Sequence, residues 1–502
     1  MHRLYRLFII LFAVFCLTYG TDRQAFANFA DTYGFSAAGV SRGNAMTAVA
    51  HDWSSVYYNM AGLGKTRGFT GTNLTGNSDS KPVVSPRGSK LSLKRKSDGN
   101  DNVSDVPASG PSALMQYNDQ LGISYMYTYP MMKINIPRED VTGDQNLEFG
   151  TITLGLVLDL NHFIIMPDFI SSSRFGLGIG LMQDGTLVKV NDIDLRSHNY
   201  LRYGREAQRT VILAGMGFGF LDDMFGIGLG ANVWTGGEGE VVLDKVEVGP
   251  EEQYPEQQVM MDLKPESAPV LGLYLSPGKI WSALQGLEVG ASYRGEIHME
   301  IDPFKTEATL LAAGVTLDMA LSIYDYYTPH IFSLGFAYTF LPVLPDLTIS
   351  LDVEYQMWSL YDVSTAKKKW IETYNNDNDP DIELPEYRDI IVPKLGISYQ
   401  VFSWMSVNAG YFYRMSFLED DANNTVFNFL DNETHVGSLG LTFVVPKKGP
   451  MVSPIEITIA GQFQYLVAQT VEKDSDFESE LNPSYSYEGM VPSGFVEVIM
   501  RW

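Results

Sequence analysis

Hydrophobic and polar residues alternate along most of the chain. In residues 347–357 the odd positions are Leu, Ile, Leu, Val, Tyr and Met, and the even positions are Thr, Ser, Asp, Glu and Gln. Residues 455–465 and 288–301 alternate in the same way, and residues 151–160 do so with the parity reversed. A period of two is typical of a strand whose two faces have different surroundings. These segments reach about ten residues, the length that a tilted strand needs to cross a bilayer, whereas ordinary strands usually have about 5–6.

The chain ends in the segment FVEVIMRW, which alternates up to its last residue. One parity holds Val496, Val498, Met500 and Trp502, and the other holds Glu497, Ile499 and Arg501. An apolar face that ends in a terminal aromatic residue resembles the closing strand of a bacterial outer-membrane β-barrel. This end of the chain is the assembly signal of such barrels, so we expect a barrel-assembly machinery to recognise Trp502.

The whole pattern predicts an all-β protein that forms a transmembrane antiparallel β-barrel in the outer membrane. We count sixteen candidate strands, the tenth with a bulge at Pro329: 69–75, 112–117, 121–129, 151–160, 174–190, 209–220, 225–234, 268–276, 288–301, 316–340, 347–357, 389–400, 404–412, 435–445, 455–471 and 491–502. Short links contrast with long acidic ones, as periplasmic turns and external loops do in these barrels. Outside the N-terminus no stretch approaches the ~20 apolar residues of a membrane helix.

The N-terminus has the form of a signal peptide. Arg3 and Arg6 precede a long apolar run, and Ala25-Phe26-Ala27 has the A-x-A form of a cleavage site. We therefore interpret residues 1–27 as a signal peptide that is removed on export.

The next segment, residues 28–67, does not alternate. It is too short to bury a core of its own and too apolar for a free tail. We therefore expect it to form a hatch that plugs the lumen of a barrel made by residues 68–502. A short helix is expected to begin at Asp52, an acceptable N-cap residue, and a turn is expected at residues 59–62.

Composition excludes some partners. The formal net charge is −25, which argues against nucleic acid as a partner. Much of the acidity lies in loop-like stretches, which we interpret as solvated external loops, with bridging to lipopolysaccharide through divalent cations as the alternative. The chain has 28 tyrosines, 27 phenylalanines and 7 tryptophans, which are enough for aromatic girdles at both membrane interfaces. The single cysteine, Cys16, lies in the signal peptide, so no disulfide is expected.

The hatch segment contains a recognisable sequence, GFSAAGVSRGNAMTAVAHDWSSVYYNMAGL. It resembles the N-terminal hatch of the FadL/TodX family of outer-membrane transport proteins. That family has Gly-Phe, a Gly-x-Gly-Asn-Ala-like segment, an acidic residue and an Asn-Pro-Ala-Gly-Leu run. The matching positions are Phe35, Gly43, Asn44, Ala45, Asp52, Asn59, Ala61, Gly62 and Leu63. The C-terminal half is similar too, for example in DVEYQMWSLYD with its Trp358-Ser359 pair.

The resemblance implies a transporter for uptake of hydrophobic compounds, long-chain fatty acids or aromatic hydrocarbons, by ligand capture and hatch-gated passive diffusion. We expect a monomer without a cofactor. The residues to which it gives ligand or gate roles in the hatch are Phe35, Asn44, Asp52, Asn59, Met60, Ala61 and Gly62.

Two points depart from the family pattern. Met60 replaces the proline of the Asn-Pro-Ala turn, so this turn lacks a fixed φ. Gly62, which matches the family, is expected to be able to adopt a positive φ. The family has fourteen strands, so the sixteen candidates leave one hairpin in excess, which we expect near residues 209–234 or 268–276. We predict fourteen strands and keep sixteen as the alternative.

Two other function classes are alternatives. One is a general porin in which the N-terminal segment is no plug, and the other is a surface adhesive barrel whose acidic loops are the functional part. An enzyme is not expected, because the histidines are scattered and no Gly-x-Ser-x-Gly or His-Glu-x-x-His motif is present. His298 shares an inward parity with Glu296 and Glu300, and we interpret it as an ordinary polar residue of the lumen. No metal site is expected.

Overall fold

The computed structural model describes residues 29–65, 119–136, 148–182, 198–203, 210–234, 237–243, 257–263, 266–299, 310–312, 315–317, 326–340, 344–362, 368, 371–372, 375–376, 381–446, 454–479 and 482–502. The proposed signal peptide and two of the candidate strands, 69–75 and 112–117, lie outside these residues. The division of the chain at residues 27 and 67 stays a prediction.

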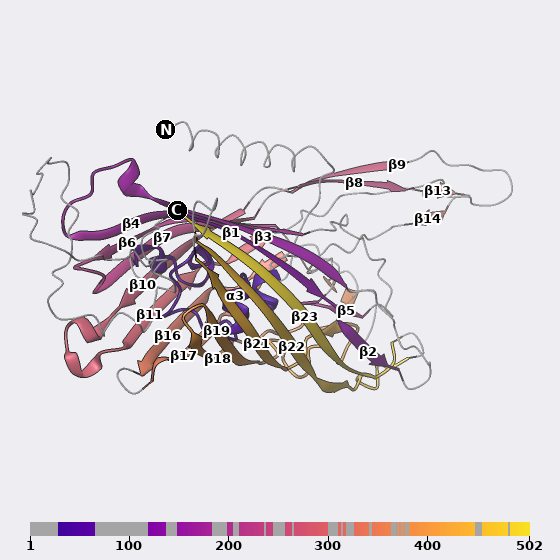
Figure 1. Ribbon diagram of the computed structural model, residues 1–502. Helices are drawn as coiled ribbons and strands as arrows, with labels where there is room; N and C mark the ends of the chain where they lie inside the picture. Colours follow the sequence, from indigo (N-terminus) through magenta and orange to yellow (C-terminus); the bar gives the residue numbers. More distant parts are fainter. Residues whose placement is uncertain are drawn as a thin grey trace, which may run out of the picture.

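Fifteen strand elements form one antiparallel sheet, and its first strand, β1 (Gln120–Thr128), pairs with its last barrel strand, β23 (Tyr485–Arg501), to close it. Strand β2 (Met131–Asn135) continues β1 after a short interruption and also pairs with β23. The wall is therefore a closed barrel of fourteen strands, as predicted, and closure leaves no sheet edge along the paired strands. Figure 1 shows the strands running side by side around the short helices of the hatch.

The other barrel strands follow one another around the wall in chain order. They are β3 (Phe149–Asp159), β4 (Ile170–Met182), β6 (Val211–Phe220), β7 (Phe225–Trp234), β10 (Glu266–Leu275), β11 (Leu287–Arg294), β16 (Ile331–Phe340), β17 (Leu344–Gln356), β18 (Ile390–Phe402), β19 (Met405–Arg414), β21 (Thr434–Val445) and β22 (Ile455–Val471).

Short strands form four smaller sheets: β5 (Asn199–Tyr200) with β20 (Phe429–Leu430), β8 (Gly237–Leu243) with β9 (Gln257–Leu263), β12 (Ile297–Met299) with β15 (Tyr326–Thr328), and β13 (Leu310–Ala312) with β14 (Val315–Leu317). Figure 1 shows the β8–β9 and β13–β14 hairpins projecting away from the barrel.

The described helices are all short. They are α2 (Phe29–Thr32), α3 (Ala37–Ser41), α4 (Ser55–Tyr58) and the 3₁₀ turns η1 (Met60–Gly64), η4 (Leu160–His162), η6 (Pro277–Lys279), η7 (Ser282–Leu284) and η8 (Trp358–Leu360). Among the described residues no helix has the length and hydrophobicity needed to cross a membrane.

The two faces of the wall differ as the alternation predicted. In β17, Leu351, Val353 and Tyr355 are exposed on the outside, while the intervening Asp352 and Glu354 are buried inside. The same holds for β21, whose Leu439 is 67% exposed to the outside. A band of apolar side chains that faces outward on all sides would be unfavourable in water. This outer band therefore contacts lipid, and the chain is a transmembrane barrel.

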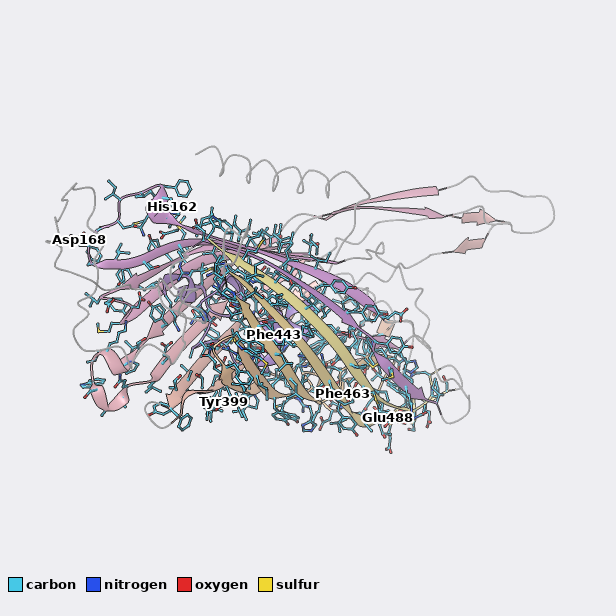
Figure 2. All side chains as sticks on the ribbon, viewed as in Figure 1. His162, Asp168, Tyr399, Phe443, Phe463 and Glu488 are labelled. Atoms are coloured by element: carbon cyan, nitrogen blue, oxygen red, sulfur yellow. The ribbon has the colours of Figure 1, made fainter. Side chains whose placement is uncertain are left out.

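Aromatic side chains border the outer apolar band. Tyr125, Tyr127, Tyr129, Tyr355, Tyr411 and Tyr465 are exposed where the strands end in long connections, and Phe336, Tyr338, Tyr399, Phe402 and Trp404 are exposed toward the short turns. Figure 2 shows Tyr399 and Phe463 at the outside of the wall. Two aromatic belts of this kind are typical of the two lipid–water interfaces of outer-membrane barrels.

Several expected strand boundaries were wrong. The predicted strand 288–301 leaves the barrel after Arg294. The Gly295 N–H still donates to the Pro269 carbonyl of β10 (2.9 Å), but Pro269 has no N–H to return the bond, and the chain continues into β12 of another sheet. The predicted strand 316–340 enters the barrel only at Ile331, and Pro329 marks a break rather than a bulge, since proline has no N–H to donate.

The location expected for a surplus hairpin was also wrong. Strands β6, β7 and β10, which cover residues 209–234 and 268–276, all belong to the barrel wall. The two candidates that raised the count to sixteen were 69–75 and 112–117, outside the described residues.

Candidate functional site

The hatch, residues 29–65, packs inside the barrel as a chain of short helices and turns, and almost all of its side chains are buried. Helix α3 begins at a Ser36 N-cap, whose Oγ accepts from the Gly39 N–H at 3.1 Å. A second orphan N–H at the start of α3, that of Ala38, donates to Glu497 Oε2 of β23 at 2.8 Å. The barrel wall thus completes the cap of a hatch helix.

An aromatic cluster forms the centre of the hatch. Phe35 is fully buried, and its ring stacks with Phe29 and Tyr57 and lies tilted 5.4 Å from the Trp53 ring. Trp53 is itself bound to the wall, since its Nε1–H donates to Glu497 Oε1 at 2.8 Å. Phe35, singled out from the sequence, is therefore a packing centre that joins three segments of the hatch.

Asn44 and Asp52 fix local backbone conformations. Asn44 has a φ of 58° and follows Gly43, whose φ is 60°, so the chain makes a left-handed turn here. Its amide donates to the Tyr33 carbonyl (3.3 Å) and accepts from the Tyr58 hydroxyl (2.7 Å). Asp52 does not start the helix as expected: its Oδ1 accepts from the Ser54 N–H (2.8 Å), and α4 begins at Ser55 after a Ser54 N-cap.

The turn expected at residues 59–62 is present as the start of η1. Asn59 caps it, because its Oδ1 accepts from the Ala61 N–H at 3.1 Å. The amide of Asn59 also donates to the Thr47 carbonyl of the hatch (2.7 Å) and to the Leu273 carbonyl of β10 (2.9 Å). One side chain thereby ties two hatch segments to the wall.

Met60, Ala61 and Gly62 fit this turn for steric reasons. Gly62 is not among the described residues with positive φ, contrary to what we expected of it. A Cβ at Gly62 would lie 2.4 Å from the Ala50 carbonyl oxygen, so the position needs glycine because another hatch segment crosses it. Met60 is fully buried, and its methyl carbon would lie 2.4 Å from a Cβ at Gly230 of β7.

A belt of inward glycines on the wall receives the hatch. On eleven of the fourteen barrel strands, a Cβ added at one or more inward glycines would lie 2.7 Å or less from a hatch atom. The glycine belt is defined here by one such residue on each of these strands: Gly122, Gly155, Gly176, Gly217, Gly228, Gly272, Gly290, Gly335, Gly396, Gly410 and Gly440. Cβ atoms essentially never come this close to another heavy atom, so any side chain at these positions displaces the hatch or the wall.

At several belt positions the hatch approaches with its backbone rather than with a side chain. A Cβ at Gly228 would lie 2.2 Å from Ala61 N, one at Gly290 would lie 2.1 Å from Thr47 O, and one at Gly410 would lie 1.9 Å from Gly43 N. Backbone atoms cannot rotate out of the way as a flexible side chain can. The hatch and the wall are therefore complementary in shape at the level of the main chain.

The three strands without a belt glycine supply polar contacts instead. Asp352 of β17 accepts from the Thr47 N–H at 2.8 Å, and Glu497 of β23 accepts from Ala38 and Trp53 as described above. Gln462 of β22 donates to the Tyr33 carbonyl at 3.0 Å. These bonds satisfy hatch groups that have left water, where an unpaired polar group is costly.

Two ion pairs add to the attachment. Lys65, at the end of the described hatch, lies 2.5 Å from Glu288 of β11, and Asp31 lies 2.7 Å from Arg294 of the same strand. The Arg294 guanidinium also stacks 4.1 Å from the Tyr57 ring centroid. The two ends of the hatch are therefore attached to one strand of the wall.

The sequence reasoning missed the glycine belt and these wall residues. The belt does leave a signal, because glycine recurs at every second position in GMGFGF of β6 and FGIGLG of β7. The alternation of apolar and polar residues does not by itself distinguish these glycines from other strand residues. The alternation puts Asp352, Glu497 and Gln462 on the polar face of their strands, but one sequence does not show which hatch atoms they meet.

Trp502, proposed as the assembly signal, lies at the seam of the barrel. Its N–H donates to the Asp119 carbonyl (3.0 Å), and its carbonyl accepts from the Asp119 N–H (3.2 Å). The last residue thus extends the pairing of β23 with β1 by one position. The carboxylate of Asp119 continues the contact to the next strand by accepting from the Asp159 N–H at 2.7 Å.

The residues weighed for catalysis and metal binding do not form a site. Within the described parts of the chain, no three His, Cys, Asp or Glu side chains converge on a possible metal position. His298 lies on β12, outside the barrel sheet, where its ring packs edge-on against Tyr327 and Tyr361. His51 lies in the hatch with Nδ1 3.0 Å from the Val49 carbonyl, and burial lowers the pKa of its imidazole.

Comparison with known proteins found similarity among solved structures. No family model matches the sequence, and no curated protein sequence matches it significantly. The structure is similar to that of a Pseudomonas aeruginosa FadL homologue, with 13% identity, 96% of this chain and 99% of that chain covered, and a TM-score of 0.49. For the Ralstonia pickettii toluene transporter TbuX, the identity is 13%, 94% of this chain and 99% of that chain are covered, and the TM-score is 0.43. For the Pseudomonas putida toluene transporter TodX, the identity is 13%, 76% of this chain and 90% of that chain are covered, and the TM-score is 0.40. Over most of its length, the chain is thus similar to solved barrels of the FadL/TodX kind.

Proposed function

We propose that this protein is an outer-membrane channel for the uptake of hydrophobic compounds, closed by its hatch and opened when the hatch rearranges. The ligand classes are those that the hatch sequence implies, long-chain fatty acids or aromatic hydrocarbons. Transport is passive diffusion after capture of the ligand, and the ligand then meets the hatch residues Phe35, Asn44, Asp52, Asn59, Met60, Ala61 and Gly62.

One observation carries the proposal: the hatch packs inside a wall whose glycine belt admits its backbone. A general porin needs an open polar lumen, whereas here hatch residues from Phe29 to Lys65 contact strands on all sides of the lumen. A channel that is blocked in this way offers small polar solutes no open path.

The chemistry on the side of the hatch toward the long connections favours an apolar ligand. Tyr33 of the hatch packs edge-on against Phe149 of β3 and Tyr203, with ring centroids 5.6 and 6.3 Å away. These rings belong to one buried cluster with Leu466 of β22 and Tyr485 of β23. Apolar and aromatic linings with a few polar groups are typical of sites for hydrophobic small molecules.

Deletion of residues 28–66 tests the proposal. The barrel keeps its closed ladder without the hatch, so the variant is expected to insert into planar bilayers and to conduct ions far better than the full chain. Uptake of a labelled long-chain fatty acid and of labelled toluene by cells that carry the full chain is measured in parallel. Equal conductance of the two proteins would show that the hatch does not close the pore, and uptake of neither compound would contradict the ligand classes.

A further inference from the structure

Two connections at the short-turn end of the barrel carry large exposed apolar side chains. They are residues 160–169, between β3 and β4, and residues 276–286, between β10 and β11. Figure 1 shows both at the end of the barrel opposite the β8–β9 and β13–β14 hairpins, and Figure 2 marks the first with His162 and Asp168. Short turns face the periplasm in outer-membrane barrels, so these connections lie on the periplasmic side. Together with the turn between β6 and β7 they form the periplasmic apolar surface, whose large exposed members are Phe163, Ile164, Ile165, Phe169, Leu221, Ile280, Trp281 and Leu284.

The side chains of this surface lie on folded turns. Ile165 is 80% exposed and Trp281 is 60% exposed. In the first connection, the Ile164 N–H donates to the Leu160 carbonyl at 2.9 Å, and in the second, the Trp281 N–H donates to the Pro277 carbonyl at 2.9 Å. These bonds belong to the 3₁₀ turns η4 and η6. The apolar side chains are therefore presented by a hydrogen-bonded backbone.

The β6–β7 turn joins the two connections. The Leu221 N–H of this turn donates to the Phe169 carbonyl of the first connection at 3.3 Å. The Met224 carbonyl of the same turn accepts from the Ser276 N–H of the second connection at 2.8 Å. The three turns are thus bonded into one structure that covers the strand ends from β3 to β11.

Stacked rings connect this surface with the outer apolar band of the wall. The Phe169 ring stacks on that of Phe220 with centroids 6.3 Å apart, and the Phe220 ring stacks on that of Phe225 at 4.9 Å. Phe220 ends β6 and shares a strand face with the exposed Met216, and Phe225 begins β7 and shares a face with the exposed Ile227. The lipid-contacting face of the barrel therefore continues past the strand ends onto the first connection.

We propose that the periplasmic apolar surface inserts into the inner leaflet of the outer membrane and binds its phospholipids. Continuity with the outer band favours lipid as the partner, and a large apolar patch would be unfavourable in water. Trp281 follows the exposed Lys279 by two residues, and this pair suits a membrane interface, where an indole lies at headgroup level and a lysine extends to water. The inserted turns would hold this side of the barrel at the boundary between headgroups and acyl chains. The inference is independent of the transported compound.

Depth-dependent fluorescence quenching in phospholipid vesicles tests the insertion. Cys16 is the only cysteine of the sequence, so a Cys16→Ser background accepts one label at a chosen site. A label at Ile165→Cys should lose most of its fluorescence to lipids with a doxyl group near the headgroup, and little to iodide in the water. Leu439→Cys, in the outer band, is the lipid reference, and Asp476→Cys, exposed on an external connection, is the water reference. The heat-modifiable band on gels confirms that each labelled barrel is folded.

Two results would overturn the proposal. Quenching of the Ile165 label by iodide as strong as that of the Asp476 label would place the surface in water. Protection of the Ile165 label from both quenchers would instead assign the surface to a contact with protein, either a second copy of this chain or a periplasmic partner.

Removal of neighbouring apolar side chains tests their part in the insertion. Phe163→Ser combined with Ile164→Ser should lower the quenching of the Ile165 label by lipid and leave that of the Leu439 label unchanged. Equal lipid quenching at Ile165 with and without these two substitutions would show that the apolar side chains do not hold the turn in the membrane.

Discussion

Substitution of one belt glycine should open the channel without harming the barrel. In Gly410→Ala the new Cβ would lie 1.9 Å from Gly43 N and 2.2 Å from the Arg42 carbonyl carbon, both backbone atoms of the hatch. Ordinary van der Waals contact begins at 3.4 Å, so this part of the hatch has to retreat by about 1.5 Å from the wall. The strand itself tolerates alanine better than glycine, since glycine loses more conformational freedom on folding.

The magnitude follows from the rigidity of the two surfaces. Overpacking a close-fitting interior costs about 1–3 kcal/mol when neighbours adjust, and here both neighbours are main chain. A destabilisation of that size changes the population of an undocked hatch about 5- to 150-fold. We therefore expect the mean conductance of Gly410→Ala in planar bilayers to rise well above that of the wild type.

Gly437→Ala is the matched control. Gly437 lies on the neighbouring strand β21 and faces outward, and a Cβ there would meet no atom within 4 Å. Both variants should give the heat-modifiable folded band on gels in wild-type amounts. If Gly410→Ala folds and conducts no more than Gly437→Ala, the close main-chain approach does not hold the hatch in place.

Other positions give further predictions. Trp502→Ala should lower the yield of folded protein in cells, because it removes the terminal aromatic side chain that we propose as the assembly signal and keeps the backbone pairing with Asp119. An unchanged heat-modifiable band would contradict the assembly role. Asn59→Ala removes the bonds to Thr47, Ala61 and Leu273, each worth about 1–3 kcal/mol when a buried partner is left unpaired. We expect slower uptake of labelled fatty acid at equal surface expression, and a wild-type rate would exclude the turn from the gate. Lys473, 6% exposed beyond the end of β22, donates to the Asn423 and Phe427 carbonyls, and burial lowers its pKa from 10.5 to about 7. Because the unfolded chain binds this proton more readily, the local fold should gain stability as the pH rises from about 7 to about 10.5. Slower proteolysis of the wild type at pH 9 than at pH 6, with a smaller difference in Lys473→Met, is the expected result, and a pH effect of equal size in both proteins would contradict it.

Much of the wall could be predicted from the sequence. Strands β7 and β22 begin and end at the predicted residues, and β1, β6 and β21 differ from the prediction by only a residue or two at their ends. This accuracy has a physical cause, because a strand with lipid on one side and a polar lumen on the other must alternate at every residue. Errors occurred where a strand leaves that environment, as after Arg294 and before Ile331.

The hatch was less predictable. Its position inside the barrel was expected from its length and hydrophobicity, and the turn at residues 59–62 was expected from the motif. The predicted start of α4 was wrong, because the Asp52 carboxylate accepts from Ser54 in the turn before the helix. The predicted reason for Gly62 was also wrong, because a hatch segment that crosses at Ala50 leaves no room for a side chain there. Such contacts depend on neighbours in space rather than on periodicity.

The sequence by itself determined the barrel, the face of each strand and the segment that fills the lumen, because solvent and lipid act on every residue of a strand and leave a regular pattern. Only the tertiary structure decided how the hatch and the wall meet. The glycine belt is made of single residues on eleven strands, and its function exists only when the closed barrel brings them around one segment.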